Sequence, residues 1–183
     1  MINFDNIYDI EAAESNVGLR YLFVSEGSQT IVKAIQYSYI QQLYGRDVYN
    51  LGFGDYEIDT DTLNDTTNSN NGDGYRVLNT VLSTIPTFFQ QYPDRILMVH
   101  GSDGHPDFID KCKASCNKNC NGDCKNFKRR INIYRRFVDK NYDTLSVDYQ
   151  FLGGFFNDEG LITLEDYIQH KPYDSVLVLK RNN

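Results

Sequence analysis

The chain has 183 residues, of which 40% are hydrophobic and 14% aromatic, and its formal net charge is −7. A chain of this length fits a single domain, residues 1–183, with enough apolar residues for a core of ordinary size. No run approaches the roughly 18 apolar residues of a membrane-spanning helix, so we expect no membrane association. The first residues carry no basic or apolar leader segment, which favours a cytoplasmic location.

Three strands open the predicted fold. Residues 18–25 and 29–40 are rich in branched and aromatic residues, and the second of these segments alternates with a period of two. Residues 48–58 make the third strand, in which Gly52 and Gly54 suggest a bulge or a close approach of another backbone. The short turns between these segments indicate an antiparallel meander.

A helix and a short strand follow a polar loop over residues 59–73. The apolar positions of residues 74–91 recur at spacings of three and four, which predicts a helix with Asp73 at its N-cap. Pro86 lies inside this helix and should kink or shorten it. Residues 95–100 are largely apolar, as in a central strand.

The C-terminal part adds a second helix over residues 126–140 and two strands over 145–152 and 174–181. The resulting order is β-β-β-α-β-α-β-β. We therefore expect an α+β fold with a mainly antiparallel sheet and two helices packed on one face.

All four cysteines lie in one short segment at a regular Cys-x3-Cys spacing, at positions Cys112, Cys116, Cys120 and Cys124. Crowded thiols in a chain from a reducing compartment are usually metal ligands. Four thiolates satisfy tetrahedral zinc, and closed sites of this kind are structural rather than catalytic. The spacing therefore predicts a structural zinc site that staples the loop. An iron–sulfur cluster or another metal, and disulfides or free thiols, stay open as alternatives.

The charge is unevenly distributed. Residues 111–140 hold ten of the 18 basic residues and two acidic ones, a local charge of +8, whereas the rest of the chain carries −15. A basic segment on an acidic body suggests an anionic partner, such as nucleic acid or another polyanion. The alternative is that the segment docks on the chain's own acidic surface, on a protein partner or on a second copy in a homodimer.

A candidate anion site lies where the strand 95–100 ends in Gly101 and Ser102 and a basic helix follows. A strand, a turn of small residues and a helix start are a favourable place for a phosphate or carboxylate. The alternative is that the arginines form the solvated face of an amphipathic helix. The predicted anion-binding residues are Ser102, Lys128, Arg129, Arg130, Tyr134 and Arg135.

Several of these segments together resemble one family of small bacterial proteins of unknown function. The resemblance rests on Asn-Leu-Gly-Phe-Gly-Asp at 50–55, Ser-Asn-Asn-Gly-Asp at 69–73, Gly-Ser at 101–102 and Arg-x-x-x-Tyr-Arg at 130–135. Members of that family pass almost directly from the Gly-Ser turn into the arginine helix. The resemblance therefore implies that residues 103–127, with all four cysteines, are an insertion.

The same resemblance marks polar positions that could share a pocket. Besides Ser102, Arg130 and Tyr134, they are Asn50, Asp55, Asn70, Asn71 and Asp73. Turn and cap chemistry explains the positions from Asn70 to Asp73 equally well.

The first functional hypothesis is a binding module, in which the basic helix and the zinc-stapled loop bind nucleic acid or another polyanion, with Phe127, Tyr134 or Tyr142 stacking on bases. The second is an enzyme acting on a nucleotide or another phosphate-bearing substrate, with Ser102 and Arg130 holding the anion and Asp55 or Asp73 as acid or base. No nucleophile–base pair or phosphate loop supports it. The third is an interaction protein of a toxin–antitoxin or phage-defence pair.

Overall fold

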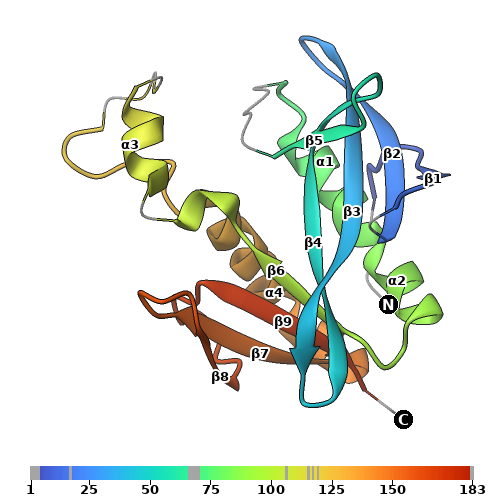
Figure 1. The fold of residues 1–183 in the computed structure, drawn as a ribbon, viewed down its shortest axis with the longest axis vertical. Coiled ribbons are helices and arrows are strands. Elements are labelled where there is room, and N and C mark those ends of the chain that lie inside the picture. The colour runs from blue at the N-terminus through green and yellow to red at the C-terminus, as the bar shows by residue number, and fades with distance from the viewer. Residues whose placement is uncertain are drawn as a thin grey trace. The chain divides into compact units, whose positions relative to one another are not determined.

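A computed structural model describes residues 5–16, 18–65, 71–105, 107–114, 116, 118 and 120–181. The chain divides into two compact units, one formed by Met1–Leu97 with Leu179–Asn183 and the other by Met98–Val178. The expectation of one domain stays a prediction. The α+β class with mostly antiparallel strands is confirmed (Figure 1). Within the described ranges, no helix has the length and apolar character needed to cross a membrane.

The first unit contains the predicted meander. Its strands lie in the order β1-β2-β3-β4, and all neighbours are antiparallel. β5 pairs with the C-terminal end of β4, from Asp55 to Glu57. The strand bounds are β1 Glu11–Ala13, β2 Gly18–Glu26, β3 Thr30–Leu43, β4 Arg46–Glu57 and β5 Thr62–Asn64. The sequence analysis missed β1 and β5 because three residues are too short to show an alternating pattern.

Gly52 and Gly54 of β4 were predicted to mark a bulge or a close approach of another backbone. An added Cβ at Gly54 would lie 2.2 Å from the carbonyl oxygen of Asn64, so β5 approaches the backbone of β4 closely at this residue. The predicted close approach is therefore confirmed at Gly54. The register irregularity lies elsewhere, between Tyr39 and Gln41 of β3.

Where one helix was predicted over 74–91, the structure has two, α1 Gly74–Ser83 and α2 Ile85–Gln91. The break falls at Thr84, just before Pro86, as expected for a residue that cannot continue the helical hydrogen bonds. The buried hydroxyls of Tyr37 on β3 and Thr84 share a hydrogen bond of 2.6 Å. This bond holds the break in the helix against the sheet.

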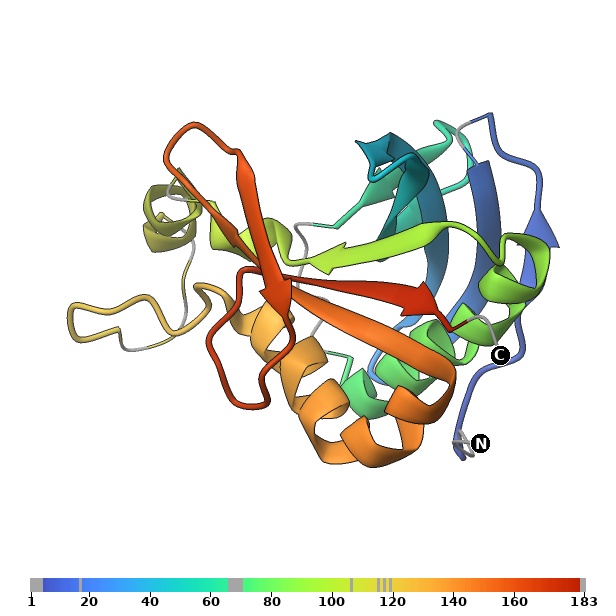
Figure 2. The ribbon, with the colours of Figure 1, turned by 90° about the horizontal axis from the view of Figure 1, so that it is seen from below.

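The second unit combines strands with one long helix. Its elements are β6 Ile96–His100, which begins in the first unit, the short 3-10 helix Ser102–Gly104, α3 Asp107–Lys113, α4 Arg129–Asp148, β7 Tyr149–Phe156, β8 Ile162–Asp166 and β9 Ser175–Lys180. The strands follow the order β6-β9-β7-β8, and β7 pairs with β8 in antiparallel register. Figure 2 shows α4 along the face formed by β7 and β9.

The boundary between the last helix and the following strand was predicted wrongly. The helix continues to Asp148, eight residues beyond the predicted end, and the strand begins at Tyr149 instead of residue 145. Tyr142 and Leu145 continue the three- and four-residue spacing from Val138, so they extend the packed face of the helix. Neither β8 nor α3, both short elements, was predicted.

Candidate functional site

The turn after β6 and the start of α4 bring two of the predicted anion-binding residues together. The guanidinium Nη1 of Arg130 donates a hydrogen bond to Oγ of Ser102 at 3.1 Å. The two residues are 28 positions apart, and the segment between them contains all four cysteines. The predicted proximity of the small-residue turn and the basic helix is thus present in the structure.

Asp103 occupies the helix N-terminus at which an anion was predicted. Its Oδ2 accepts a hydrogen bond from the backbone N–H of Arg130 at 2.8 Å, and its carbonyl oxygen accepts one from the N–H of Lys128 at 3.0 Å. The residue is 4% exposed, and in the described part of the chain its Oδ1 has no hydrogen-bond partner. Burial raises the pKa of this carboxyl, and the Arg130 N–H and charge offset part of that rise.

Gly101 makes room for this arrangement. A Cβ at this position would lie 2.3 Å from Oδ1 of Asp103 and 3.1 Å from Cβ of Arg130. Any side chain at Gly101 would therefore displace the carboxylate from the helix N-terminus. Gly101 was predicted to leave space for an external anion. In the structure it leaves space for the carboxylate of Asp103.

The other predicted anion-binding residues of α4 differ in exposure. Lys128 forms an ion pair of 2.6 Å with Asp174, and Arg135 donates to Oδ1 of Asn132 at 3.0 Å. Tyr134 is 6% exposed and belongs to the core. Arg129 is the exposed member of the predicted set. Three of these side chains therefore serve contacts within the second unit.

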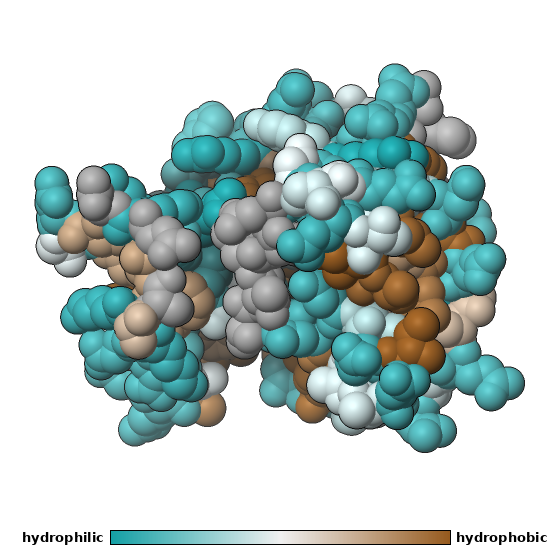
Figure 3. All heavy atoms as spheres, turned by 90° about the horizontal axis from the view of Figure 1, so that it is seen from above, coloured by the Kyte–Doolittle hydropathy of each residue, from teal (hydrophilic) through white to brown (hydrophobic). Residues whose placement is uncertain are grey.

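Exposed basic residues other than Arg129 occur along α4 and in the segment that precedes it. Arg129, Arg136 and Lys140 are exposed at positions i, i+7 and i+11 of α4, so they lie along one side of the helix. The exposed lysines of α3 and the cysteine loop add to them, and we call the whole set the basic face: Lys111, Lys113, Lys118, Lys125, Arg129, Arg136 and Lys140. Much of the surface in Figure 3 is hydrophilic, with smaller apolar areas.

Cys112 lies in the last turn of α3, and the other three cysteines lie between α3 and α4; all four are half-buried and without a disulfide. Sγ of Cys116 is 3.8 Å from Sγ of Cys120. The hydrogen bond from Asn126 lowers the pKa of the Cys112 thiol, but burial and the thiols of Cys124 and Cys116 raise this pKa overall. Across the described ranges, no three His, Cys, Asp or Glu side chains converge closely enough to hold a metal ion.

Asn126 links the sulfur atoms to the basic face. Its amide nitrogen donates to Sγ of Cys112 at 3.4 Å and to Sγ of Cys116 at 3.7 Å. Its amide oxygen accepts a hydrogen bond from Nζ of Lys118 at 2.8 Å. The backbone N–H of Lys125 donates to Sγ of Cys120 at 3.5 Å. The role of Asn126 was not predicted, because its contacts are to cysteines 14 and 10 residues away along the chain.

In the first unit, Asn71 holds the β2–β3 hairpin. Its amide nitrogen donates to Oγ of Ser25 at 2.8 Å and to the carbonyl oxygen of Gln29 at 2.9 Å. Its amide oxygen accepts a hydrogen bond from the N–H of Gln29 at 2.8 Å. Asn71 is 5% exposed, so these bonds satisfy a buried amide. Its role is structural, whereas Asn70 lies outside the described residues.

Asp73 takes the N-cap position of α1, but its carboxylate does not cap the helix. Oδ2 of Asp73 accepts hydrogen bonds from the hydroxyl of Tyr8 at 2.7 Å and from Oγ of Ser25 at 2.6 Å. Burial raises the pKa of this carboxyl, but these two hydroxyls and the nearby charge of Lys33 outweigh burial and lower the pKa overall. The aspartate thus anchors the N-terminal segment and β2 to the start of α1.

Asp55 and Asn50 lie on opposite faces of β4. Asp55 pairs with Lys33 across the sheet and forms an ion pair with it, and Lys33 is 5% exposed. Asn50 pairs with Ser38 and lies five positions before Asp55, on a part of the strand with regular register. Successive side chains of a strand point to opposite faces. These two members of the predicted pocket therefore do not face each other.

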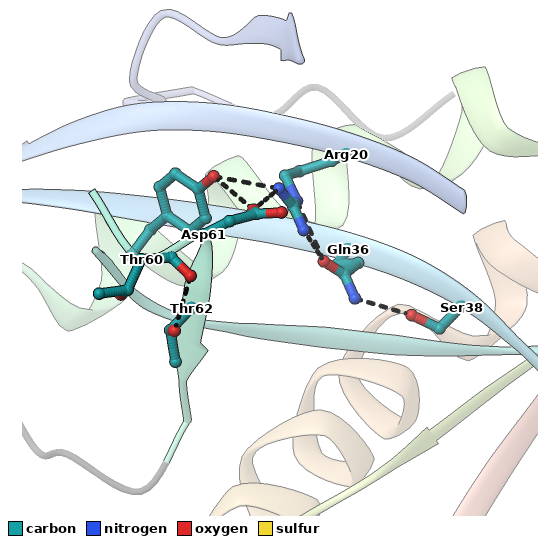
Figure 4. Close-up of polar contacts among 7 residues, drawn as sticks. Arg20, Gln36, Ser38, Thr60, Asp61 and Thr62 are labelled. Atoms are coloured by element: carbon teal, nitrogen blue, oxygen red, sulfur yellow. Dashed lines mark hydrogen bonds and ion pairs between the residues drawn. The ribbon is translucent and has the colours of Figure 1, made fainter. Parts of the chain in front are cut away.

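A polar network that the sequence analysis missed covers the face of Asn50 (Figure 4). Nε and Nη2 of Arg20 donate to Oε1 of Gln36 at 3.0 and 2.8 Å, and Nη1 forms an ion pair with Asp61. Tyr56 donates to the same carboxylate at 2.7 Å. Arg20 is 5% exposed, so the network neutralises a buried charge. The sequence indication for this network is Arg20, a charged residue in a largely apolar strand.

The comparisons with known proteins agree with the resemblance in the sequence. A model of a family of unknown function, DUF6934, matches residues 5–105, more than half of the chain. The chain belongs to this family. No curated protein and no solved structure matches it. The matched range includes Asn50, Asn71 and Ser102 but ends before the first cysteine, so the resemblance of the arginine helix stays a prediction.

Proposed function

We propose that this chain is a binding module whose basic face binds the backbone of a nucleic acid or another polyanion. The observation that carries the proposal is the line of Arg129, Arg136 and Lys140, which are exposed along one side of α4. Basic side chains that stay in solvent are available to neutralise phosphates and to release their counterions. This gives affinity without requiring a pocket.

The lysines of the cysteine loop extend the same proposal. Lys118 and Lys125 are exposed in the segment that leads into α4, and Lys111 and Lys113 are exposed on α3. Lys113 lies 3.3 Å from Asp110, a solvent-exposed pair that contributes little and leaves the lysine able to change partners. We expect a zinc ion held by the four cysteines to keep this loop in place. Reduced thiols of this kind fit a cytoplasmic location.

Contacts to phosphates, rather than stacking on bases, are the main expected interaction. Tyr134 is buried, and the ring of Tyr142 stacks on that of Tyr167 at a centroid distance of 5.9 Å. Phe127 is half-buried and lies 5.5 Å from Nζ of Lys128. The aromatic residues considered for stacking therefore have partners within the chain, which favours binding with little sequence preference.

The alternative of an enzyme that holds a phosphate between Ser102 and Arg130 is less favoured. The carboxylate of Asp103 lies at the N-terminus of α4 and accepts the N–H of Arg130. An incoming phosphate would meet this like charge and would have to displace it. The basic face needs no such displacement.

The test is binding of the full chain to labelled single-stranded and double-stranded oligonucleotides over a series of salt concentrations. We expect binding at about 50 mM salt, and an association constant whose logarithm falls linearly with the logarithm of the salt concentration. Heparin should compete, because the interaction depends on charge. Absence of binding to both oligonucleotides and to heparin at that salt concentration would refute the proposal.

A further inference from the structure

We infer that the four cysteines close around one zinc ion in a tetrahedral site, and that Asn126 is the positioning residue that orients the sulfur ligands. The inference goes beyond binding of a polyanion, because it assigns the ion, its four ligands and its outer hydrogen bonds. Its first support is that every cysteine of the chain lies in the short segment from the end of α3 to Cys124, half-buried and free of disulfides.

The distance between two of the sulfurs fits the geometry of such a site. Zinc–thiolate bonds are about 2.3 Å long, and two corners of a tetrahedron with this bond length are about 3.8 Å apart. The Sγ atoms of Cys116 and Cys120 are 3.8 Å apart. A disulfide would require about 2.05 Å between these atoms. These two thiols are therefore spaced as ligands of one ion.

Local contacts relate the other two cysteines to this pair. The amide nitrogen of Asn126 donates to Sγ of both Cys112 and Cys116, which brings Cys112 near the pair. Cys124 follows Cys120 after a turn at Gly122, whose φ is +94° and whose N–H donates to the carbonyl oxygen of Cys120 at 3.1 Å. Closing the tetrahedron requires Cys112 and Cys124 to approach the pair.

Among the residues that the structure describes, no three metal-binding side chains converge, so the ion itself has to close the site. The free energy of zinc binding can order a short loop in this way, because a preformed site is not required before the ion binds. Binding would have to bring Cys112 and Cys124 to the pair of Cys116 and Cys120.

Hydrogen bonds to the sulfurs form the outer part of the site. Asn126 donates to Cys112 and Cys116, and the N–H of Lys125 donates to Cys120. Donors of this kind stabilise the negative charge of thiolates and hold ligands in the orientation that the metal requires. The amide oxygen of Asn126 also accepts from Lys118, whose positive charge partly offsets the charge of a zinc tetrathiolate. A single side chain thus contacts two ligands and one lysine of the basic face.

The first experiment measures metal in the full chain after purification under reducing conditions. We expect one zinc per chain by elemental analysis, and cobalt substitution should give the absorption of a tetrahedral cobalt–thiolate centre. Cys112→Ser and Cys124→Ser should each abolish the tetrathiolate spectrum. Folded protein without metal, stoichiometric iron, or disulfides found by mass spectrometry under reducing conditions would overturn the inference.

The second experiment tests Asn126 by itself. Asn126→Asp removes the N–H donors and places a carboxylate beside the sulfurs, so the zinc affinity should fall by about 10- to 100-fold with a shifted cobalt–thiolate spectrum. Asn121→Asp adds the same charge at an exposed position of the loop and should change the affinity much less. Equal effects of the two variants would remove the role assigned to Asn126.

A consequence for Lys118 and Lys125 rests on the proposed function, because zinc would order the loop that carries them. Removing zinc by a chelator should then weaken oligonucleotide binding. Stoichiometric zinc without any oligonucleotide binding would refute the proposed function and leave the metal site intact. Oligonucleotide binding by a chain that takes up no zinc would refute the metal site alone.

Discussion

The carboxylate of Asp103 accepts the backbone N–H of Arg130 at 2.8 Å, so the chain supplies its own anion at the start of α4. The partial positive charge of a helix N-terminus favours such an anion. Because Asp103 is 4% exposed, the arrangement also fixes where α4 begins relative to β6. The basic residues that remain free for a partner are therefore those farther along the exposed side of the helix.

The first prediction concerns the pH dependence of stability through Asp103. Burial raises the pKa of Asp103 above that of an unfolded aspartate, so this group favours the folded state at acidic pH, and its contribution is lost as the pH rises through the raised pKa. Asp103→Asn keeps an acceptor oxygen for the Arg130 N–H but does not titrate. We expect the stability of the variant relative to the parent to increase from acidic to neutral pH.

Urea denaturation of both proteins at a series of pH values measures this difference, and taking the difference cancels the contributions of groups that titrate alike in both. Asp103→Ala should be less stable than Asp103→Asn at every pH, because it also leaves the Arg130 N–H without its acceptor. A stability difference between Asp103→Asn and the parent that does not change with pH would contradict the argument.

The second prediction concerns Asn71, which makes one buried hydrogen bond to Ser25 and two part-buried ones to Gln29. Asn71→Ala removes all three bonds, and we expect a loss of about 2 kcal/mol in the free energy of unfolding. Gln90→Ala, at an exposed position of α2, should change it by less than about 0.5 kcal/mol. Comparable urea midpoints for the two variants would show that Asn71 does not anchor the hairpin.

The third prediction concerns the packing of Gly153 of β7 against Tyr173. An added Cβ at Gly153 would lie 2.2 Å from atoms of the Tyr173 ring, which is fully buried, and the Tyr173 hydroxyl donates to Glu165 at 2.6 Å. Gly153→Ala should therefore destabilise the second unit by about 1–3 kcal/mol or more. At Gly104 the nearest atom would be 3.8 Å away, so Gly104→Ala is the matched control. Thermal denaturation followed by circular dichroism compares the two.

The fourth prediction concerns the charge of the basic face. Replacing Arg129, Arg136 and Lys140 together by alanine should weaken oligonucleotide binding and lower the salt slope by about 0.7–0.9 for each phosphate contact that is lost. Arg46→Ala removes a basic residue of the β3–β4 hairpin, outside the basic face, and should leave the slope unchanged. If the slope of the triple variant equals that of the parent, the polyanion binds elsewhere.

Much of the first unit followed from local patterns. The alternation of residues 29–40 and the turn after Glu26 correctly predicted β2 and β3, and Pro86 marked the break between α1 and α2. The opposite orientations of Asn50 and Asp55 were also accessible, because an odd separation on a regular strand places two side chains on opposite faces. The pocket predicted from these positions did not use that relation.

Other features of the candidate site depend on contacts between distant residues. Tyr142, in the part of α4 beyond the predicted end, packs on the rings of Phe151 and Tyr167, which come later in the chain. The role of Asn126 requires the sulfurs of Cys112 and Cys116, which are 14 and 10 residues away. No pattern along the chain reports such a contact.

The sequence by itself determined the α+β class, the cysteine spacing and the concentration of basic charge in residues 111–140, because periodicity, spacing and charge are properties of the chain. Only the tertiary structure decided which basic residues remain in solvent. Folding pairs Lys128 with Asp174 and places Asp103 at the start of α4, and it leaves Arg129, Arg136 and Lys140 exposed. The physical reason is that a charge removed from water needs a partner, and the fold determines which charges are removed.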